Sequence, residues 1–503
     1  MEAKTAFTLL LALPLIASPV IYILGRVEYR FLYTRVVAAR WLCLLVLGAT
    51  WFPLLQLRAP VLEEGAVLWP IGRIVLQLDG LGYFLAVTVL GLATLVTIFS
   101  FQYVKDEPDE EKYYALLAAM TASMIGLGCT RDLFNLWVWF EAMAITSYLL
   151  VAFHHEQKSS LEAAVKYLVQ SAVGSLLVLL GIALVFMLTA TLDLESIRPL
   201  MADSGAIGLV AGGLVIVGFG VKTAMVPMHT WLPDAHSQAP SGISAMLSGV
   251  VIECGLVAML RALGGLAEAS LAWGALLLFF AALNMLVGNL MALRQTEVKR
   301  MLAYSSVAQV GYMLFGFGVT LSYGVPDGAA GGFFHLFNHA MMKGLAFLAA
   351  GALLYALHLS QGRHQPLVLD DLNGAARRYP VTAFALSVAL LGLGGLPPLA
   401  GFMSKWQIFV SGAEVRSTPL LWMVIFAGLN SVLSLGYYAP LVNRLYRREP
   451  SSAVLQGRPI AILMGVPLLL MSLGSVAVGV WPKLLAWVTH PAALALLRSF
   501  GFH

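Results

Sequence analysis

The sequence predicts an all-α membrane protein with about fourteen transmembrane helices, two of them broken. Of its 503 residues, 60% are hydrophobic and only 11% are charged, whereas about 25% of the residues in a soluble domain are charged. Apolar runs of about 20 residues, the length that crosses a bilayer, recur along the whole chain. No polar stretch between them is long enough for a separate domain, so residues 1–503 are expected to form a single membrane domain.

The individual spans follow from cutting the sequence at polar residues and at breaks rich in proline or glycine. The first run, residues 7–24, has neither a strongly basic leader nor a cleavage site of small residues, which predicts a retained helix and not a signal peptide. The predicted centres lie near residues 15, 47, 92, 120, 143, 176, 216, 251, 282, 310, 345, 392, 430 and 472.

The basic residues of the loops predict an orientation. Of the 30 lysines and arginines, seventeen fall in one set of alternating loops and nine in the other, while four lysines fall within or at the edge of apolar spans. Because cytoplasmic loops carry the excess of basic residues, both termini are expected outside the cytoplasm. The larger set includes Arg35, Arg40, Lys299 and Arg363, and the smaller set includes Arg73 and Arg261.

Composition also argues against several kinds of site. The net charge is only +4 and the basic residues form no continuous stripe, so nucleic acid is not an expected partner. Cys43, Cys129 and Cys254 stand alone, without a CxxC motif or a histidine-rich neighbourhood, which argues against an iron–sulfur cluster, a zinc site or a disulfide framework. We expect this chain to hold no cofactor and no metal.

Two acidic residues lie in the middle of predicted spans. They are Glu141 in LFNLWVWFEAMAITSYLLVAF and Glu253 in MLSGVVIECGLVAMLR. A charged side chain at the centre of a bilayer costs roughly 2.5 to 3.5 kcal/mol on insertion scales, so such residues usually face the interior of a bundle and mark an ion path.

Two lysines lie beside predicted helix breaks. Lys222 precedes Pro227, and Lys405 follows the paired prolines Pro397 and Pro398. Proline removes a backbone hydrogen bond and breaks a helix. Broken helices at corresponding places in two halves of a chain are typical of transporters built from inverted repeats, with the ion sites near the middle of the membrane.

His335, His339 and Lys343 recur every four residues in GGFFHLFNHAMMKGLAFLAAG, so they lie on one helix face about a turn apart. Histidine titrates near pH 6.5, and such a line of groups can pass a proton along. Two histidines four residues apart could also bind a metal, but no acidic or third histidine ligand is near them in the sequence.

The alternative interpretation is that these side chains bridge helices by hydrogen bonds or extend to the headgroups from the ends of their spans. Lys166, near the start of its span, fits this alternative as well as it fits an ion path. His229, Asp234 and His236 flank the break at Pro227 and belong either to a vestibule or to a loop.

Four long segments resemble one family of membrane proteins. They are VKTAMVPMHTWLPDAHSQAPSGISAML, KRMLAYSSVAQVGYM, FFHLFNHAMMKGLAFLAAGAL and GLGGLPPLAGFMSKWQIF. In this order they resemble the signature segments of the antiporter-like subunits of respiratory complex I, of Mrp-type multisubunit Na⁺/H⁺ antiporters and of membrane-bound hydrogenases.

The resemblance implies fourteen helices, with N-terminal helices over residues 1–112, inverted five-helix repeats at about 113–263 and 270–446, and a C-terminal helix in 447–503. It also implies a pumping unit in which Glu141 pairs with Lys222. Lys405, on the second broken helix, is the corresponding lysine of the second half-channel. His335, His339 and Lys343 then link the two half-channels. One position departs from the family pattern, because Glu253 stands where the family usually carries a lysine or histidine.

The expected function is therefore that of an ion-translocating subunit, for H⁺ or Na⁺, in a multisubunit complex of a prokaryotic cytoplasmic membrane. Its expected partners are related antiporter-like subunits, small membrane subunits and a peripheral redox arm that would hold any iron–sulfur, flavin or nickel centres, as in an NADH-quinone oxidoreductase or a membrane-bound hydrogenase. The alternatives are a self-contained cation/proton antiporter and a structural subunit with an inactive channel.

Overall fold

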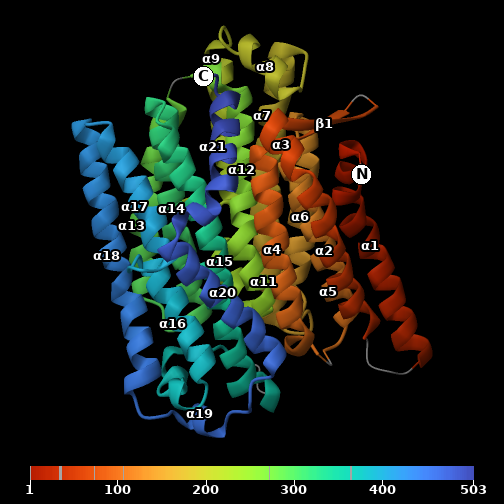
Figure 1. The fold of residues 1–503 in the computed structure, drawn as a ribbon, viewed down its shortest axis with the longest axis vertical. Coiled ribbons are helices and arrows are strands. Elements are labelled where there is room, and N and C mark those ends of the chain that lie inside the picture. The colour runs from red at the N-terminus through yellow and green to blue at the C-terminus, as the bar shows by residue number, and fades with distance from the viewer. Residues whose placement is uncertain are drawn as a thin grey trace.

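A computed structural model of the chain describes residues 2–32, 37–72, 74–105, 107–270, 272–362 and 365–502. Three basic residues counted in the predicted loops, Arg35, Arg73 and Arg363, lie outside the described residues. Long helices run side by side along one axis and form a bundle (Figure 1). The all-α membrane class is confirmed.

Within the described residues, twelve helices are long and apolar enough to cross a membrane. All fourteen predicted centres lie in helical segments. Two of these helices do not meet that criterion by themselves: α5 (Glu110–Gly128), which carries three charged residues in its first turn, and α16 (Pro380–Gly394), which has 15 residues and ends at the second break.

The full spans are α1 (Ala3–Leu32), α2 (Ala38–Gln56), α4 (Gly80–Tyr103), α6 (Leu133–Val151), α7 (Lys158–Thr189), α9 (Gly205–Lys222), α11 with α12 (Ser241–Met246 and Ile252–Gly265), α13 (Trp273–Leu293), α14 (Val298–Tyr323), α15 (Pro326–Leu357), α18 (Thr418–Arg447) and α20 (Ile462–Val480). The shorter helices are α3 (Arg58–Glu64), α8 (Leu194–Leu200), α10 (Trp231–Gln238), α17 (Ala400–Glu414), α19 (Ser452–Gln456) and α21 (Ala486–Ser499).

The two predicted breaks are present. The first separates α9 from α10, and the amide of Asn284 on α13 supports it by accepting from the N–H of Val226 at 2.9 Å and donating to the carbonyl of Ala224 at 3.4 Å. The second separates α16 from α17, where Gly395 ends the helix in the left-handed conformation at φ +80°. Each break contains a proline, which cannot donate a backbone hydrogen bond.

Two regions differ from the sequence prediction. An antiparallel hairpin of β1 (Ala66–Ile71) and β2 (Ile74–Asp79) lies between α3 and α4. Its strands show no regular alternation of apolar and polar residues, so it carries little sequence signal. The C-terminal segment 447–503, expected to contain one helix, contains α19, α20 and α21.

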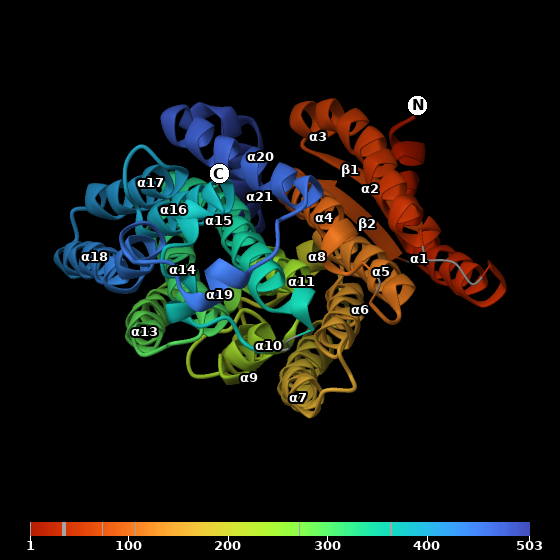
Figure 2. The same cartoon turned by 90° about the horizontal axis from the view of Figure 1, so that it is seen from below.

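The interior of the bundle is formed by three spans, around which the others are arranged (Figure 2). In the most apolar stretch of each span, all residues of α11 and α12 are buried, as are 94% of the residues of α14 and 89% of those of α15. The corresponding fractions are 28% for α18 and 33% for α7. Ionisable side chains on α12, α14 and α15 therefore face protein and not lipid.

Candidate functional site

Lys222 is the last residue of α9, directly before the first break, and only 1% of it is exposed. Its ammonium donates to the hydroxyl of Tyr167 at 2.6 Å and lies 3.4 Å and 3.5 Å from the hydroxyls of Ser147 and Ser171. The ring of Tyr167 stacks on Trp231, with centroids 4.0 Å apart and planes inclined by 5°. The lysine therefore lies against a hydroxyl and aromatic cluster supplied by α6, α7 and α10.

Glu141 lies on α6 and is partly buried. Its Oε1 is buried without a hydrogen-bond partner among the described residues, and within this part of the chain it forms no ion pair with Lys222. The resemblance implies a pair of these residues, whereas the structure keeps them within electrostatic range but not in contact.

Glu253 and His339 meet in the centre of the bundle. Oε1 of Glu253 on α12 lies 2.7 Å from Nδ1 of His339 on α15, and neither side chain is exposed. Oε2 of Glu253 and Nε2 of His339 have no hydrogen-bond partner in the described chain. The partner of this unusual acid is therefore a histidine of the second half and not Lys222.

His335, one turn before His339, is connected toward the second break. Its Nε2 donates to the side-chain oxygen of Gln309 at 3.0 Å, and its Nδ1 lies 2.9 Å from the hydroxyl of Ser404. The amide of Gln309 donates to the carbonyl of Leu393 at 3.0 Å.

Lys405 shares that carbonyl. Its ammonium donates to Leu393 O at 2.8 Å and to the hydroxyl of Ser431 at 3.0 Å, and it lies 4.4 Å from the ring centroid of Tyr312. Hydrogen bonds thus connect His335 to Lys405 through the side chain of Gln309 and the carbonyl of Leu393. His335 and Lys405 are both buried.

Lys343 points to α14. Its ammonium donates to the carbonyl of Leu302 at 2.7 Å and to the hydroxyl of Ser305. The hydroxyl of Tyr438 on α18 donates to the same serine at 2.7 Å. The three residues predicted to share a face of one helix are all buried on α15, where His335 and Lys343 bond to α14 and His339 bonds to α12.

The four secondary candidates gather around α10. Asp234 pairs with Lys166 at 3.2 Å and with Arg300 at 2.8 Å, at a cavity of about 260 Å³. The side chain of Lys166 is 50% exposed, so it belongs to this open cluster and not to the buried set.

The two histidines of this region, His229 before α10 and His236 within it, are less exposed than Lys166. His229 is partly buried, with its ring centroid 6.2 Å from that of Tyr304. His236 is fully buried and stacks on Phe347 with ring centroids 4.6 Å apart, and neither of its ring nitrogens has a partner among the described residues.

Three basic residues predicted in loops are instead buried. Arg40 on α2 pairs with Glu110 at 3.0 Å, and Lys299 on α14 donates to a backbone carbonyl at 2.5 Å. Arg261 on α12 forms two hydrogen bonds to Asp79, at 3.1 Å and 2.7 Å. The loop assignment is wrong for these three because each lies within the first or last turns of a helix, close to a predicted boundary, where a carboxylate or carbonyl partner offsets the cost of burial.

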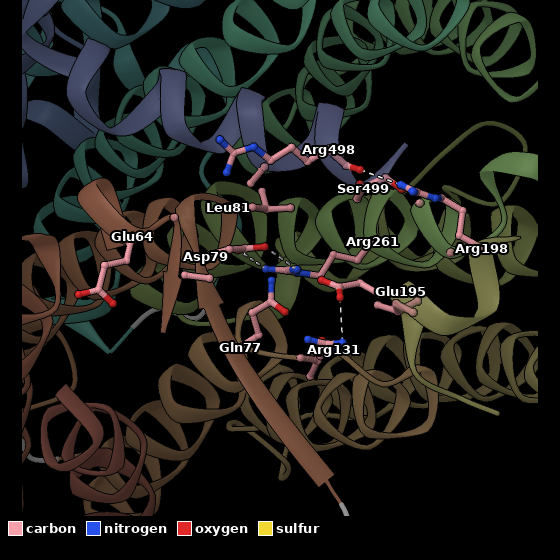
Figure 3. Close-up of a pocket in the computed structure, with 17 residues that line it drawn as sticks. Glu64, Gln77, Asp79, Leu81, Arg131, Glu195, Arg198, Arg261, Arg498 and Ser499 are labelled. Atoms are coloured by element: carbon pink, nitrogen blue, oxygen red, sulfur yellow. Dashed lines mark hydrogen bonds and ion pairs between the residues drawn. The ribbon is translucent and has the colours of Figure 1, made fainter. Parts of the chain in front are cut away.

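A cavity of about 560 Å³ opens at the end of the bundle that carries α8, β1 and α21, and Figure 3 shows the residues around it. Charged side chains of both signs line it, including the pair of Asp79 with Arg261 and that of Arg131 with Glu195. None of the buried lysines, glutamates or histidines predicted from the sequence lines this cavity.

Sequence reasoning missed the polar residues that surround the charged ones. Tyr167 carried no signal of its own in the sequence. Ser305, Gln309 and Ser404 lie in segments that carry the family resemblance, but only their neighbours in space show which charged residues they serve. Lys299 begins one of these segments, but its position beside Arg300 favoured a loop.

The sequence profile described as "NADH:quinone oxidoreductase/Mrp antiporter, TM" matches residues 130–434, more than half of the chain. The chain belongs to this family. It is 34% identical over 441 residues to F(420)H(2) dehydrogenase subunit N of Methanosarcina mazei, covering 87% of this chain and 88% of that protein. It is 30% identical over 433 residues to NADH-quinone oxidoreductase subunit N 2 of Symbiobacterium thermophilum, covering 83% and 82%.

Solved structures agree with this family membership. A chain of the membrane-bound sulfane sulfur reductase, an archaeal respiratory membrane complex, superimposes with a TM-score of 0.86 at 27% identity over 99% of both chains. A chain of the Mrp complex from Dietzia sp. has the same fold, with a TM-score of 0.86 at 23% identity over 99% of this chain and 98% of that one. The protein is thus an antiporter-like integral membrane subunit of the kind found in multisubunit complexes.

Proposed function

We propose that this chain carries protons across a prokaryotic cytoplasmic membrane through Glu141, Lys222, Glu253, His339, His335 and Lys405, with Lys343 beside the path. The observation that carries the proposal is that Lys222, Lys343 and Lys405 are 1%, 0% and 2% exposed inside the bundle. Charged groups at this depth usually serve ion transport, and two of these lysines lie beside a broken helix.

The path has connected sections and gaps. Lys222 joins Tyr167 and Ser147, Glu253 joins His339, and His335 joins Lys405 through Gln309. The rings of His335 and His339 are 6.5 Å apart between centroids, too far for direct transfer. We infer that water or side-chain motion closes these gaps during transport, so that each section holds a proton until the next accepts it.

The chemistry of the buried groups favours H⁺ over Na⁺. A protonated lysine offers only donors, so Lys222, Lys343 and Lys405 cannot ligate a metal cation while charged. Lysine and imidazole nitrogens bind and release protons.

A redox-driven complex is the favoured setting. The two relatives described above are subunits of an F(420)H(2) dehydrogenase and an NADH-quinone oxidoreductase. We propose that partner subunits hold the redox centres of such a complex and that neighbouring antiporter-like and small membrane subunits flank this chain. An excess of basic residues in one set of loops supports placing both termini outside the cytoplasm.

We further propose that residues 113–263 and 270–446 are the two inverted repeats. Each contains one broken helix, and in each a buried lysine lies beside the break. This arrangement is expected of a transporter with one half-channel per repeat.

The test uses the native complex, isolated through a tag on this chain, with companion subunits identified by mass spectrometry. In vesicles, Glu141→Gln is expected to lower proton uptake during substrate oxidation by the share that this chain carries, while the set of companions stays complete. Glu414→Gln, the same change at an exposed residue of α17, should transport normally. Full proton uptake by the Glu141→Gln complex would overturn the proposal. A tagged chain without redox companions that exchanges cations for protons would instead indicate a self-contained antiporter.

A further inference from the structure

The contact between Glu253 and His339 places two titratable groups in direct hydrogen-bond distance at the centre of the chain. Each side chain uses one atom in this contact, and the other two, Oε2 and Nε2, are buried and without partners in the described residues. Leaving a buried polar atom unpaired is energetically unfavourable. Oε2 and Nε2 are two such atoms, at the outer ends of one hydrogen-bonded pair. Their placement indicates that protons enter and leave the pair through these atoms.

The charge around the pair explains why an acid is tolerated. The cationic or titratable groups that act on His339 are Lys343, His335 and Lys405. An isolated buried carboxylate is strongly unfavourable, but a shared proton allows Glu253 and His339 to exist as an ion pair or as two neutral groups with the same net charge. Such a pair titrates as one unit.

The position of α12 connects the pair to the first break. Gly255 packs against that break so closely that an added Cβ would lie 2.9 Å from the hydroxyl of Thr223 and 3.1 Å from Cβ of Lys222. On the opposite side of the same turn, Glu253 reaches α15. The pair thus lies between Lys222 and the groups that lead to Lys405.

The helix widens just before the glutamate. Leu247–Val251 form a π-helical turn between α11 and α12, a feature frequently found at functional sites. Ser248 within this turn lies 2.5 Å from Ser306 of α14, between the two hydroxyl oxygens. The turn ends two residues before Glu253.

We propose that Glu253 and His339 form a proton-sharing station that replaces the single lysine or histidine usual at this position, an inference that rests on the proposed function. A proton binds Nε2 of neutral His339 while the Nδ1–H bond breaks and an Oε1–H bond forms, leaving a neutral imidazole and a carboxylic acid. The carboxyl group of Glu253 then rotates, so that its O–H bond faces the side of the unpaired oxygen, and this bond breaks as the proton passes to the next acceptor. Rotation of the neutral imidazole ring exchanges the places of its two nitrogens, so that Nε2–H faces the carboxylate of Glu253 and the unprotonated Nδ1 can bind the next proton, which completes the cycle.

The experiment records infrared difference spectra of the native complex between rest and turnover, with and without isotope-labelled histidine. The wild type is expected to show a protonated-carboxyl band and an imidazole band that appear together. Glu253→Gln should remove the carboxyl band and shift the imidazole band, while Glu253→Asp and the exposed control Glu414→Gln should keep both. His339→Gln, a second variant of similar polarity, should shift the carboxyl band.

A carboxyl band unchanged by Glu253→Gln, or an imidazole band unaffected by it, would overturn the proposal. The same samples are assayed for proton uptake and for pH-induced spectra without turnover. If the wild-type complex moves no protons but the paired bands appear on titration, the proposed function fails and the station stands. If Glu141→Gln lowers uptake by the share of this chain and the bands are independent of each other, the function stands and the station fails.

Discussion

The ammonium of Lys222 lies 2.6 Å from the hydroxyl of Tyr167, and that ring stacks face to face on Trp231 with centroids 4.0 Å apart. The indole nitrogen of Trp231 in turn donates to the carbonyl of Val221 at 2.7 Å. Tyr167 therefore contacts both sides of the first break, through the hydrogen bond from Lys222 at the end of α9 and through the stacked ring of Trp231 on α10. A shift of α10 would change the surroundings of Lys222.

Tyr167→Phe is expected to slow transport about tenfold, because a buried ammonium loses a hydrogen bond worth about 1.5 kcal/mol or more. The measurement is the initial rate of proton uptake in vesicles at a fixed rate of substrate oxidation. Tyr323→Phe removes a hydroxyl from a 44% exposed tyrosine at the end of α14 and should leave the rate unchanged. Equal rates for both variants would show that Tyr167 does not serve Lys222.

Gln309→Leu is expected to uncouple the second half of the path. The change removes the acceptor of His335 Nε2 and the donor to Leu393 O, so a buried imidazole nitrogen loses its partner at a cost of about 1 to 3 kcal/mol. The share of proton uptake that passes through this chain should fall at least tenfold, and the complex should remain assembled by gel filtration. Normal uptake by this variant would require another route from His335 to Lys405.

Asn284→Ala is expected to destabilise the first break. The Asn284 amide accepts from Val226 N–H and donates to the carbonyls of Ala224 and Val307, so its loss leaves buried backbone groups unpaired, at about 1 to 3 kcal/mol. The midpoint of thermal unfolding of the complex should fall. Asn443→Ala on the exposed face of α18 is the matched control, and an equal midpoint for both variants would contradict the role of Asn284.

Asp193, in the loop before α8, supplies a pH-dependent contribution to stability. Burial raises its pKa, but hydrogen bonds from Arg131 at 2.7 Å and from Ser196 outweigh this, so the pKa is held below its usual value. Because the folded pKa is depressed, the stabilisation is present above the unfolded pKa of about 3.9 and is lost as pH falls below it.

Asp193→Asn should therefore lower the unfolding midpoint at pH 7, and the gap to wild type should close below about pH 4. Asp203→Asn, at an exposed position, should produce no such gap. A gap that persists unchanged in acid would contradict the charge-based origin of the stabilisation.

The sequence predicts the bundle and its breaks because long apolar runs and proline pairs are local signals. It predicts that Lys222, Glu253 and Lys405 are buried for the same reason, since each interrupts a run of apolar residues. All fourteen predicted centres lie in helices, although α5 begins with three charged residues and the second break limits α16 to 15 residues.

Contacts between distant helices escape prediction. The pairing of Glu253 with His339 joins residues 86 positions apart, and that of Arg261 with Asp79 joins residues 182 apart. Neither spacing leaves a periodic pattern. Lys299 shows the related error, because a basic residue at the start of a span has the same sequence context whether it faces water or a buried carbonyl.

The most direct test of proton transport by this chain is the number of protons moved per pair of electrons by the native complex. Lys222→Ala combined with Lys405→Ala is expected to lower that ratio by the number of protons that this chain moves. Substrate oxidation should continue, no longer coupled to proton transport through this chain. Lys483→Ala, at an exposed residue, should leave the ratio at the wild-type value. An unchanged ratio in the double variant, with the complex intact, would contradict the account.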